Sequence, residues 1–339
     1  MNSIVLLLLA YTRFFALQGG GDMVIRNPFS LLRIQGEGAK IEMALYGARN
    51  RERWGILTYD RYDNTVGDMG IYTKTLLYSN MPSFIVSYAK KNFAVSLGYL
   101  PLLNFDYKYE SNLKDANYLP SNNYDINRTG GLSLLGVGAE GRFKRFYGGT
   151  YFAYGKGRIE QTEFYSDTII NWILDLKGFI PYAYMGATLD NVELMLGFNP
   201  RVSLSSNPLP VYPMSVYTSL ALFRPSPLMD RATFEFIYRF YEKAGYLTDG
   251  FTVLAGLEHT SYNNFFFTLK AGIEKTYLEQ DTYVPVYKVS FGQTFAGMKI
   301  FGALEYQNVK YSRYDSASGE YANVTENTLR FNVGLQIKP

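Results

Sequence analysis

The final segment of the chain alternates between apolar and polar side chains. In TLRFNVGLQIKP, from Thr328 to Pro339, every second residue is apolar: Leu329, Phe331, Val333, Leu335 and Ile337. Successive side chains of a β-strand point to opposite faces, so this pattern predicts a strand with one apolar and one polar face. The apolar face could meet either a protein core or lipid.

The same alternation recurs along most of the chain, and charged residues keep to one face of each segment. It predicts an all-β, antiparallel protein of about 14 strands, with roughly 12 to 16 as the range. Residues 49–81 hold two more strand-like pieces, WGILTYDRY and GIYTKTLLY, which form either an outer hairpin or an additional strand pair. The other strands are expected near residues 39–48, 82–90, 92–109, 129–145, 147–160, 177–189, 191–204, 214–223, 231–242, 250–260, 263–277, 284–296, 298–310 and 327–338.

The connections between these strands alternate in length. Short turns, such as those at 144–147 and 190–191, are followed by longer polar stretches, such as 160–175 and 205–213. Outer-membrane barrels have short periplasmic turns and longer outer loops. A soluble sandwich with Greek-key crossings has no reason to keep this rhythm. The sequence therefore predicts an antiparallel transmembrane β-barrel in a bacterial outer membrane, with a soluble or lipid-anchored β-sandwich as the alternative.

The composition supports a membrane location and narrows the chemistry. Aromatic residues make up 17% of the chain, with 31 Tyr and 24 Phe. Tyrosine suits positions where one end of the ring is apolar and the other is wet, as at a membrane interface. The formal net charge of +3 gives no reason to expect a nucleic-acid partner, and the absence of cysteine excludes disulfides and thiolate sites.

The N-terminal residues divide into two predicted segments ahead of the barrel. The apolar run at 4–10 is too short to span a bilayer and suits a signal peptide, which we place at residues 1–17. Residues 18–38 contain three successive glycines and the pair Asn27 and Pro28, with little alternation. We expect this segment to be a hatch inside the lumen, the alternative being a disordered periplasmic tail. Residues 39–339 then form the barrel.

No catalytic or metal site is expected from the sequence. The single histidine, His259, lies near a predicted strand end, so its role is expected to be structural. The segment GVGAEG at 136–141 matches a dinucleotide-binding fingerprint, but it lies inside an alternating strand rather than before a helix. Inward charged residues of both signs are expected to line a wet lumen: Glu140, Arg142, Lys144, Glu193, Glu235, Arg239, Glu258, Lys270, Glu274, Lys299, Glu305 and Arg330. The protein is therefore expected not to be an enzyme and to need no cofactor.

Two stretches resemble FadL-like long-chain fatty-acid transporters. Residues 25–47 resemble the passage from hatch to first strand, with Asn27 and Pro28 matching the start of an Asn-Pro-Ala motif and Phe29 in place of its alanine. Residues 82–109 and 130–160 resemble that family's order of strand, tight turn, long third strand, outer loop, strand, tight turn and strand. The chain departs from many outer-membrane barrels by ending in Ile-Lys-Pro rather than on an aromatic residue.

The resemblance implies a monomeric barrel of 14 strands, plugged by its N-terminus, that conducts hydrophobic molecules such as long-chain fatty acids. Its partners would be the lipid bilayer and a hydrophobic ligand. In that family a kink in the third strand opens the wall sideways. Here Pro101 interrupts the corresponding run, so Gly98, Tyr99, Leu100 and Pro101 are the candidate lateral opening. A simple strand end or bulge at Pro101 is the alternative.

Two other functions fit the same fold. A barrel of this shape could serve as a binding or shuttle protein in export or surface assembly, without transporting small molecules. It could also be a general polar porin. The contents of the lumen distinguish these functions, because a transporter of apolar compounds needs apolar surface inside the barrel.

Overall fold

The structure is a computed structural model of the whole chain. The residues that it describes are 15–16, 37–59, 61–62, 64–77, 82–104, 107–114, 120–165, 168–204, 211–223, 229–240, 249–261, 264–275, 283–315 and 320–337.

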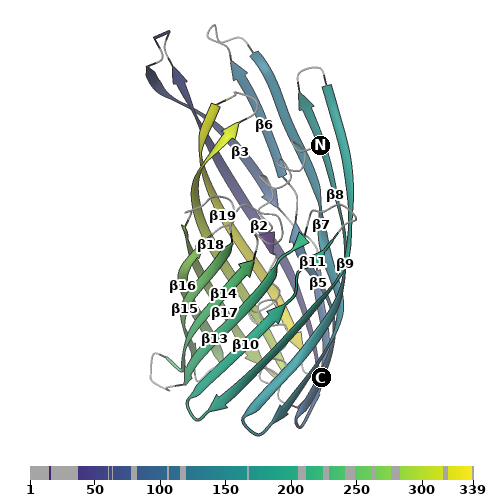
Figure 1. Cartoon of the computed structure of the whole chain (residues 1–339). Helices are drawn as coiled ribbons and strands as arrows, with labels where there is room; N and C mark the ends of the chain where they lie inside the picture. The colour runs from purple at the N-terminus through teal and green to yellow at the C-terminus, as the bar shows by residue number, and fades with distance from the viewer. Residues whose placement is uncertain are drawn as a thin grey trace.

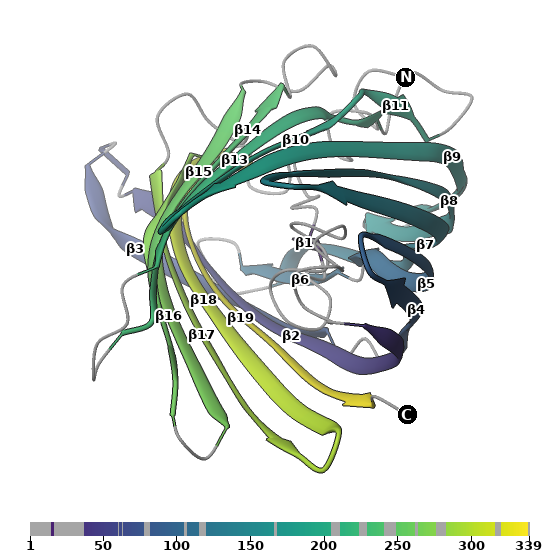
Figure 2. The ribbon, with the colours of Figure 1, turned by 90° about the horizontal axis from the view of Figure 1, so that it is seen from below.

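Fourteen antiparallel strands form a closed barrel, which Figure 2 shows along its axis. Each strand pairs with the next, and β19 pairs with β2 through the register Leu335↔Met43 to close the ring. The prediction of 14 wall strands is confirmed. In chain order they are β2 (Gly38–Tyr59), β4 (Pro82–Lys90), β5 (Phe93–Asn104), β7 (Pro120–Phe143), β8 (Phe146–Tyr165), β9 (Thr168–Leu189), β10 (Val192–Asn199), β13 (Met214–Phe223), β14 (Arg231–Phe240), β15 (Gly250–Thr260), β16 (Phe265–Lys275), β17 (Tyr283–Phe295), β18 (Met298–Asp315) and β19 (Glu320–Ile337).

The extra strand-like pieces at 49–81 form an outer hairpin. The first half of β2 pairs with β4, whereas its second half pairs with β3 (Thr65–Leu77). In the same way β7 pairs with β5 over one half and with β6 (Tyr107–Lys114) over the other. The single strand expected at 92–109 is therefore described as two, β5 and β6. β3 and β6 therefore extend the barrel wall upward on one side, as Figure 1 shows.

Three short strands complete the described structure. β11 (Val202–Ser203) and β12 (Val211–Tyr212) pair with each other in the connection from β10 to β13. β1 (Phe15–Ala16) pairs with Asn104 and Leu103 of β5. Apart from β1, Glu37 and Gly38, the predicted signal peptide and hatch lie outside the described residues, so both remain predictions. No helix in the described part of the chain is long and apolar enough to cross a membrane.

The short turns gather at the lower end of the barrel in Figure 1. All described non-glycine residues with positive φ lie at this end, because tight hairpins need the left-handed conformation. They are Lys91, Lys144, Asp190, Asn264 and Ala296. The predicted alternation of short turns and longer connections is thus present, as in barrels of the outer-membrane type, whose short turns lie at the periplasmic end.

The outward face of the wall is apolar in every strand. Large apolar side chains stand exposed there, at the positions that the alternation assigns to one face. Examples, one from each wall strand, are Leu45, Phe84, Leu97, Leu135, Phe152, Phe179, Leu196, Leu222, Phe234, Leu257, Leu269, Phe291, Leu304 and Val333. A continuous apolar belt around a closed barrel is the surface that lipid covers. The apolar face of each strand therefore meets lipid.

Candidate functional site in the barrel lumen

One part of the inner wall carries apolar side chains instead of polar ones. All but one of these residues point inward from consecutive wall strands, β4 to β10, and together with Leu204 they pack into one buried cluster. We call this cluster the apolar sector. It comprises Ile85, Leu100, Leu132, Leu134, Tyr147, Tyr151, Ala153, Ile159, Leu176, Ile180, Tyr184, Met195 and Leu204.

The strand register builds this sector from positions two residues apart. Leu132 and Leu134 of β7 both face inward, and their exposed shares are 0% and 3%. Tyr151 lies beside them, where a Cβ on Gly136 would come within 2.6 Å of the Tyr151 ring. The glycine therefore leaves the space in which the aromatic ring lies flat against β7. In the same way the ring of Tyr147 occupies the space over Gly186.

A loop segment completes the apolar sector. Beyond β10 the chain runs along the edge of β9, where the N–H of Lys177 donates to the carbonyl of Leu204 at 2.7 Å. Leu204 is 1% exposed and joins the cluster. Further along β9 toward the short turns, the rings of Tyr147 and Tyr184 have centroids 6.1 Å apart. The apolar sector thus combines aliphatic and aromatic side chains, which suits contact with an apolar molecule.

A polar group borders the apolar sector toward the longer loops. Arg128 is buried, and its Nε donates to Oε1 of Gln161 at 2.5 Å. Gln161 in turn donates to Glu163, and Nε1 of Trp172 donates to the same carboxylate at 3.4 Å. Buried polar groups of this kind fix the orientation of a bound molecule in otherwise apolar sites.

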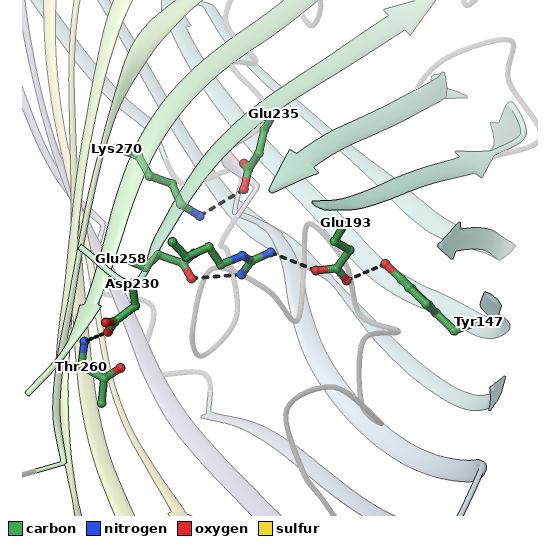
Figure 3. A network of polar contacts seen from close by, with 8 residues as sticks. Tyr147, Glu193, Asp230, Glu235, Glu258, Thr260 and Lys270 are labelled. Atoms are coloured by element: carbon green, nitrogen blue, oxygen red, sulfur yellow. Dashed lines mark hydrogen bonds and ion pairs between the residues drawn. The ribbon is translucent and has the colours of Figure 1, made fainter. Parts of the chain in front are cut away.

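The opposite part of the inner wall carries charges of both signs. We call its inward residues on β14 to β19 and β2, together with Glu193, the charged sector. At its centre Arg231 lies between two carboxylates, 3.0 Å from Glu258 and 3.5 Å from Glu193. The hydroxyl of Tyr147 donates to Glu193 at 2.7 Å, so this tyrosine joins the two sectors. Figure 3 shows this chain of contacts across the lumen side of the wall.

Further ion pairs extend the charged sector around the barrel. Nζ of Lys270 lies 3.1 Å from Glu235, two strands away. It reaches across β15 at Gly256, where a Cβ would come within 2.5 Å of the lysine side chain. Glu305 pairs with both Lys288 and Arg330 on the neighbouring strands. Because these buried charges all have partners of opposite sign, this part of the wall is a fixed polar surface.

The predicted inward charges are mostly where the alternation placed them. They include Glu140, Glu193, Glu235, Lys270 and Glu305, which are all buried. Arg142 keeps to the inward face, because it pairs with Tyr147, but it is exposed at the end of β7. The prediction is wrong for Lys144, which lies exposed in the turn that follows. The alternation ends with the strand, so it cannot place residues of the turn.

Two other features of the sequence lie within a strand or at its end. The segment 136–141 lies within β7, without a helix after it. Nδ1 of His259 lies 3.5 Å from Asp230, at the end of β15. Within the described ranges, no group of three or more His, Asp or Glu could hold a metal ion.

The predicted wall residues lie where the pairing of β5 changes. Gly98 and Tyr99 pair with β4 on one side and β7 on the other. In the described residues the pairing with β4 ends at Tyr99, whereas the pairing with β7 continues through Leu100 and Pro101. The register with β7 then shifts between Pro101 and Leu103, which makes Leu102 a bulge.

The predicted hatch residues Asn27 and Pro28 lie outside the described residues. The sequence reasoning also missed the apolar sector as a site. Its signal was present, because large apolar residues such as Leu132, Leu134 and Ile180 occupy inward positions among glycines.

No protein-family model matches the chain, and no curated protein sequence matches it. Several solved structures are similar along nearly its whole length. A FadL homologue of Pseudomonas aeruginosa has 10% identity and a TM-score of 0.67, covering 98% of this chain and 96% of its own.

Two further structures are similar to the same degree. The toluene transporter TodX of Pseudomonas putida has 10% identity and a TM-score of 0.68, covering 97% of this chain and 96% of its own. The toluene transporter TbuX of Ralstonia pickettii has 10% identity and a TM-score of 0.66, with the same coverages of 97% and 96%. At this identity the likeness establishes the fold: the chain is a 14-stranded transmembrane barrel with the FadL-like fold.

Proposed function

We propose that the protein is a channel for hydrophobic small molecules in a bacterial outer membrane. The observation that carries this proposal is the apolar sector on the inner wall of a barrel whose outer face is already apolar. Moving apolar surface out of water stabilises a complex by about 25 cal/mol per Å², or ~0.8 kcal/mol per methylene. A barrel lined only by polar groups offers an apolar molecule no such gain.

The structural neighbours support this class of ligand. They are described as a FadL homologue, as toluene transporters and as a monoaromatic hydrocarbon channel. These descriptions are of channels rather than enzymes. We infer that the ligand is apolar or has one polar end, as in a long-chain fatty acid, and that the barrel acts as a monomer in the lipid bilayer.

The site where the β4 pairing ends is our candidate for lateral release. Leu100 belongs to the apolar sector, and Pro101 follows it directly in β5. Proline has no N–H to donate, so Pro101 favours an interrupted ladder there. A molecule leaving the sector between Gly98 and Pro101 would pass from apolar protein surface into lipid without crossing a charged wall.

We also propose that residues 18–38, with Asn27 and Pro28, act as the hatch. A barrel of this strand number needs an obstruction if it is to keep polar solutes out while passing apolar ones. Three successive glycines allow a tight path inside a lumen.

The proposal is tested with the purified protein in liposomes. Binding of radiolabelled oleate and entry of arabinose are measured side by side. We expect saturable oleate binding with slow arabinose entry, and faster arabinose entry after deletion of residues 18–34. Fast arabinose entry in the intact protein without oleate binding would make it a general porin. Neither activity would favour a non-transporting barrel, and unchanged arabinose entry in the deletion variant would refute the hatch.

A further inference from the structure

The lipid-facing surface of the barrel contains an apolar groove near the short-turn end. It has a volume of about 670 Å³ and crosses five adjacent strands, β8, β9, β10, β13 and β14. This volume lies within the range of ~300–1,000 Å³ that is typical of small-molecule sites. Its lining is apolar apart from Tyr147, Thr218 and Ser219, so water has few polar partners there.

The strand register explains how the groove forms. One row of outward residues crosses all five strands, and a second row lies beside it toward the loops. The rows are Phe146, Ala187, Leu194, Leu220 and Phe234, and then Gly148, Met185, Leu196, Thr218 and Phe236. The small side chains Ala187 and Thr218 stand between larger ones in each row, so the surface is hollowed there and walled by Phe146 and Phe234.

A basic turn lies at one end of this groove. Lys144 and Arg145 form the turn between β7 and β8, and Arg145 directly precedes Phe146. The carbonyl of Arg145 accepts from the N–H of Thr188, the residue after Ala187, at 2.8 Å. The turn is therefore fixed against the strand that forms the floor of the groove.

The charge of this turn is only partly balanced. Lys144 and Arg145 are both exposed. Asp190 lies 3.6 Å from Arg145, with both side chains largely in solvent, so this ion pair is weak. Two basic residues against one acidic residue leave a positive rim beside an apolar groove.

We propose that this groove and basic turn bind a phospholipid with an anionic headgroup from the periplasmic leaflet. The acyl chain lies along the two outward rows, and the headgroup phosphate lies at Lys144 and Arg145. Short turns mark the periplasmic end of such barrels, and basic residues beside a membrane attract anionic lipids. A bound lipid of this kind fixes the height and tilt of this wall in the bilayer.

The test is native mass spectrometry of the full-length protein in detergent with equal amounts of phosphatidylglycerol and phosphatidylethanolamine. We expect phosphatidylglycerol to be retained preferentially. In the variant Lys144→Glu/Arg145→Glu this preference should fall by about fivefold or more, since each cation near a membrane contributes ~1 kcal/mol. In Ala187→Phe the hollow is filled, so retention of both lipids should fall.

Matched variants separate this site from general effects. Lys90→Glu/Lys91→Glu reverses two charges in another short turn, where Lys91 has nearly the same φ as Lys144, 51° against 54°. Ala271→Phe enlarges another outward-facing alanine, on β16 outside the groove. Both controls should retain phosphatidylglycerol as the unmodified protein does.

The outcomes decide the proposal. Equal retention of both lipids by the unmodified protein would overturn it. So would a loss as large in Lys90→Glu/Lys91→Glu, or displacement of phosphatidylglycerol by millimolar inorganic phosphate, which would indicate a site for a free anion. Oleate binding in the same samples reports on the lumen, so failure of the groove and failure of the channel proposal are distinguishable.

Discussion

The two sectors of the lumen wall share one strand pattern and differ in what their inward positions carry. Both have an apolar outward face, so the lipid does not distinguish them. The apolar sector packs Leu132, Leu134 and Ile180 tightly together, whereas the charged sector fixes Arg231 and Lys270 among carboxylates. This difference indicates that a wall strand needs only an apolar outward face to insert into the membrane. The inward positions remain open to be specialised, one side for contact with apolar molecules and the other for a rigid polar lining.

The charged sector should show the largest loss of stability when one partner is removed. In Arg231→Met, the carboxylates of Glu193 and Glu258 lose their shared cation, and both stay largely buried. Breaking a buried pair in this way costs about 3–5 kcal/mol. We expect a clear fall in the temperature at which the barrel changes its migration on a gel.

A matched substitution checks that burial is the cause. Arg158 pairs with Glu160 at 2.9 Å, but both side chains are about half exposed, 53% and 52%. Arg158→Met should cost under about 1 kcal/mol. Equal losses in the two variants would show that the charged sector is not held by its buried pairs.

Substitutions in the apolar sector should cause the next largest loss of stability. The loss should depend on whether the side chain faces the lumen or the lipid. Leu134 and Leu135 are adjacent in β7, but the exposed shares are 3% for Leu134 and 55% for Leu135. Leu134→Ala leaves a cavity in packed protein and should cost about 2–5 kcal/mol. Leu135→Ala should cost less, because lipid fills the space.

The same pair of variants links packing to function. Oleate affinity should fall in Leu134→Ala and stay unchanged in Leu135→Ala, measured by equilibrium binding in liposomes. A loss of affinity in Leu135→Ala alone would place the apolar ligand on the outer face and remove the role proposed for the apolar sector.

The smallest effect on stability is expected at the edge of the apolar sector. Pro101→Ala restores an N–H in β5, so stability should hold or rise by about 0.5–1.5 kcal/mol if a ladder bond forms. Oleate should still bind, but its release into the membrane should slow, because a restored ladder narrows the candidate opening. Release is measured by transfer of fluorescent fatty acid into the bilayer.

A second proline provides the control for this prediction. Pro285 lies in β17, outward-facing and exposed, on the charged side of the barrel. Pro285→Ala should leave fatty-acid release unchanged. If Pro101→Ala behaves in the same way, Pro101 marks only a bulge in the strand, and the lateral route has to be abandoned.

Much of the wall could be predicted because its determinants are local. Alternation fixes which face of a strand is apolar, and short connections fix which strands are neighbours; both can be read within about twenty residues. The break in the long third strand was also visible, because Pro101 cannot donate to a ladder. Its exact consequence was not visible, since the sequence does not say that the β4 pairing ends at Tyr99 while the β7 pairing continues.

The sequence by itself determined the antiparallel wall strands and which face of each is apolar. The tertiary structure decided which inward residues meet. Gln336 and Glu42 form a hydrogen bond across the barrel closure, although 294 positions separate them. Tyr147 and Glu193 meet only because the register stacks β8, β9 and β10 at one height. Ring closure and register set these long-range neighbours, and neither leaves a trace in the local alternation of a strand.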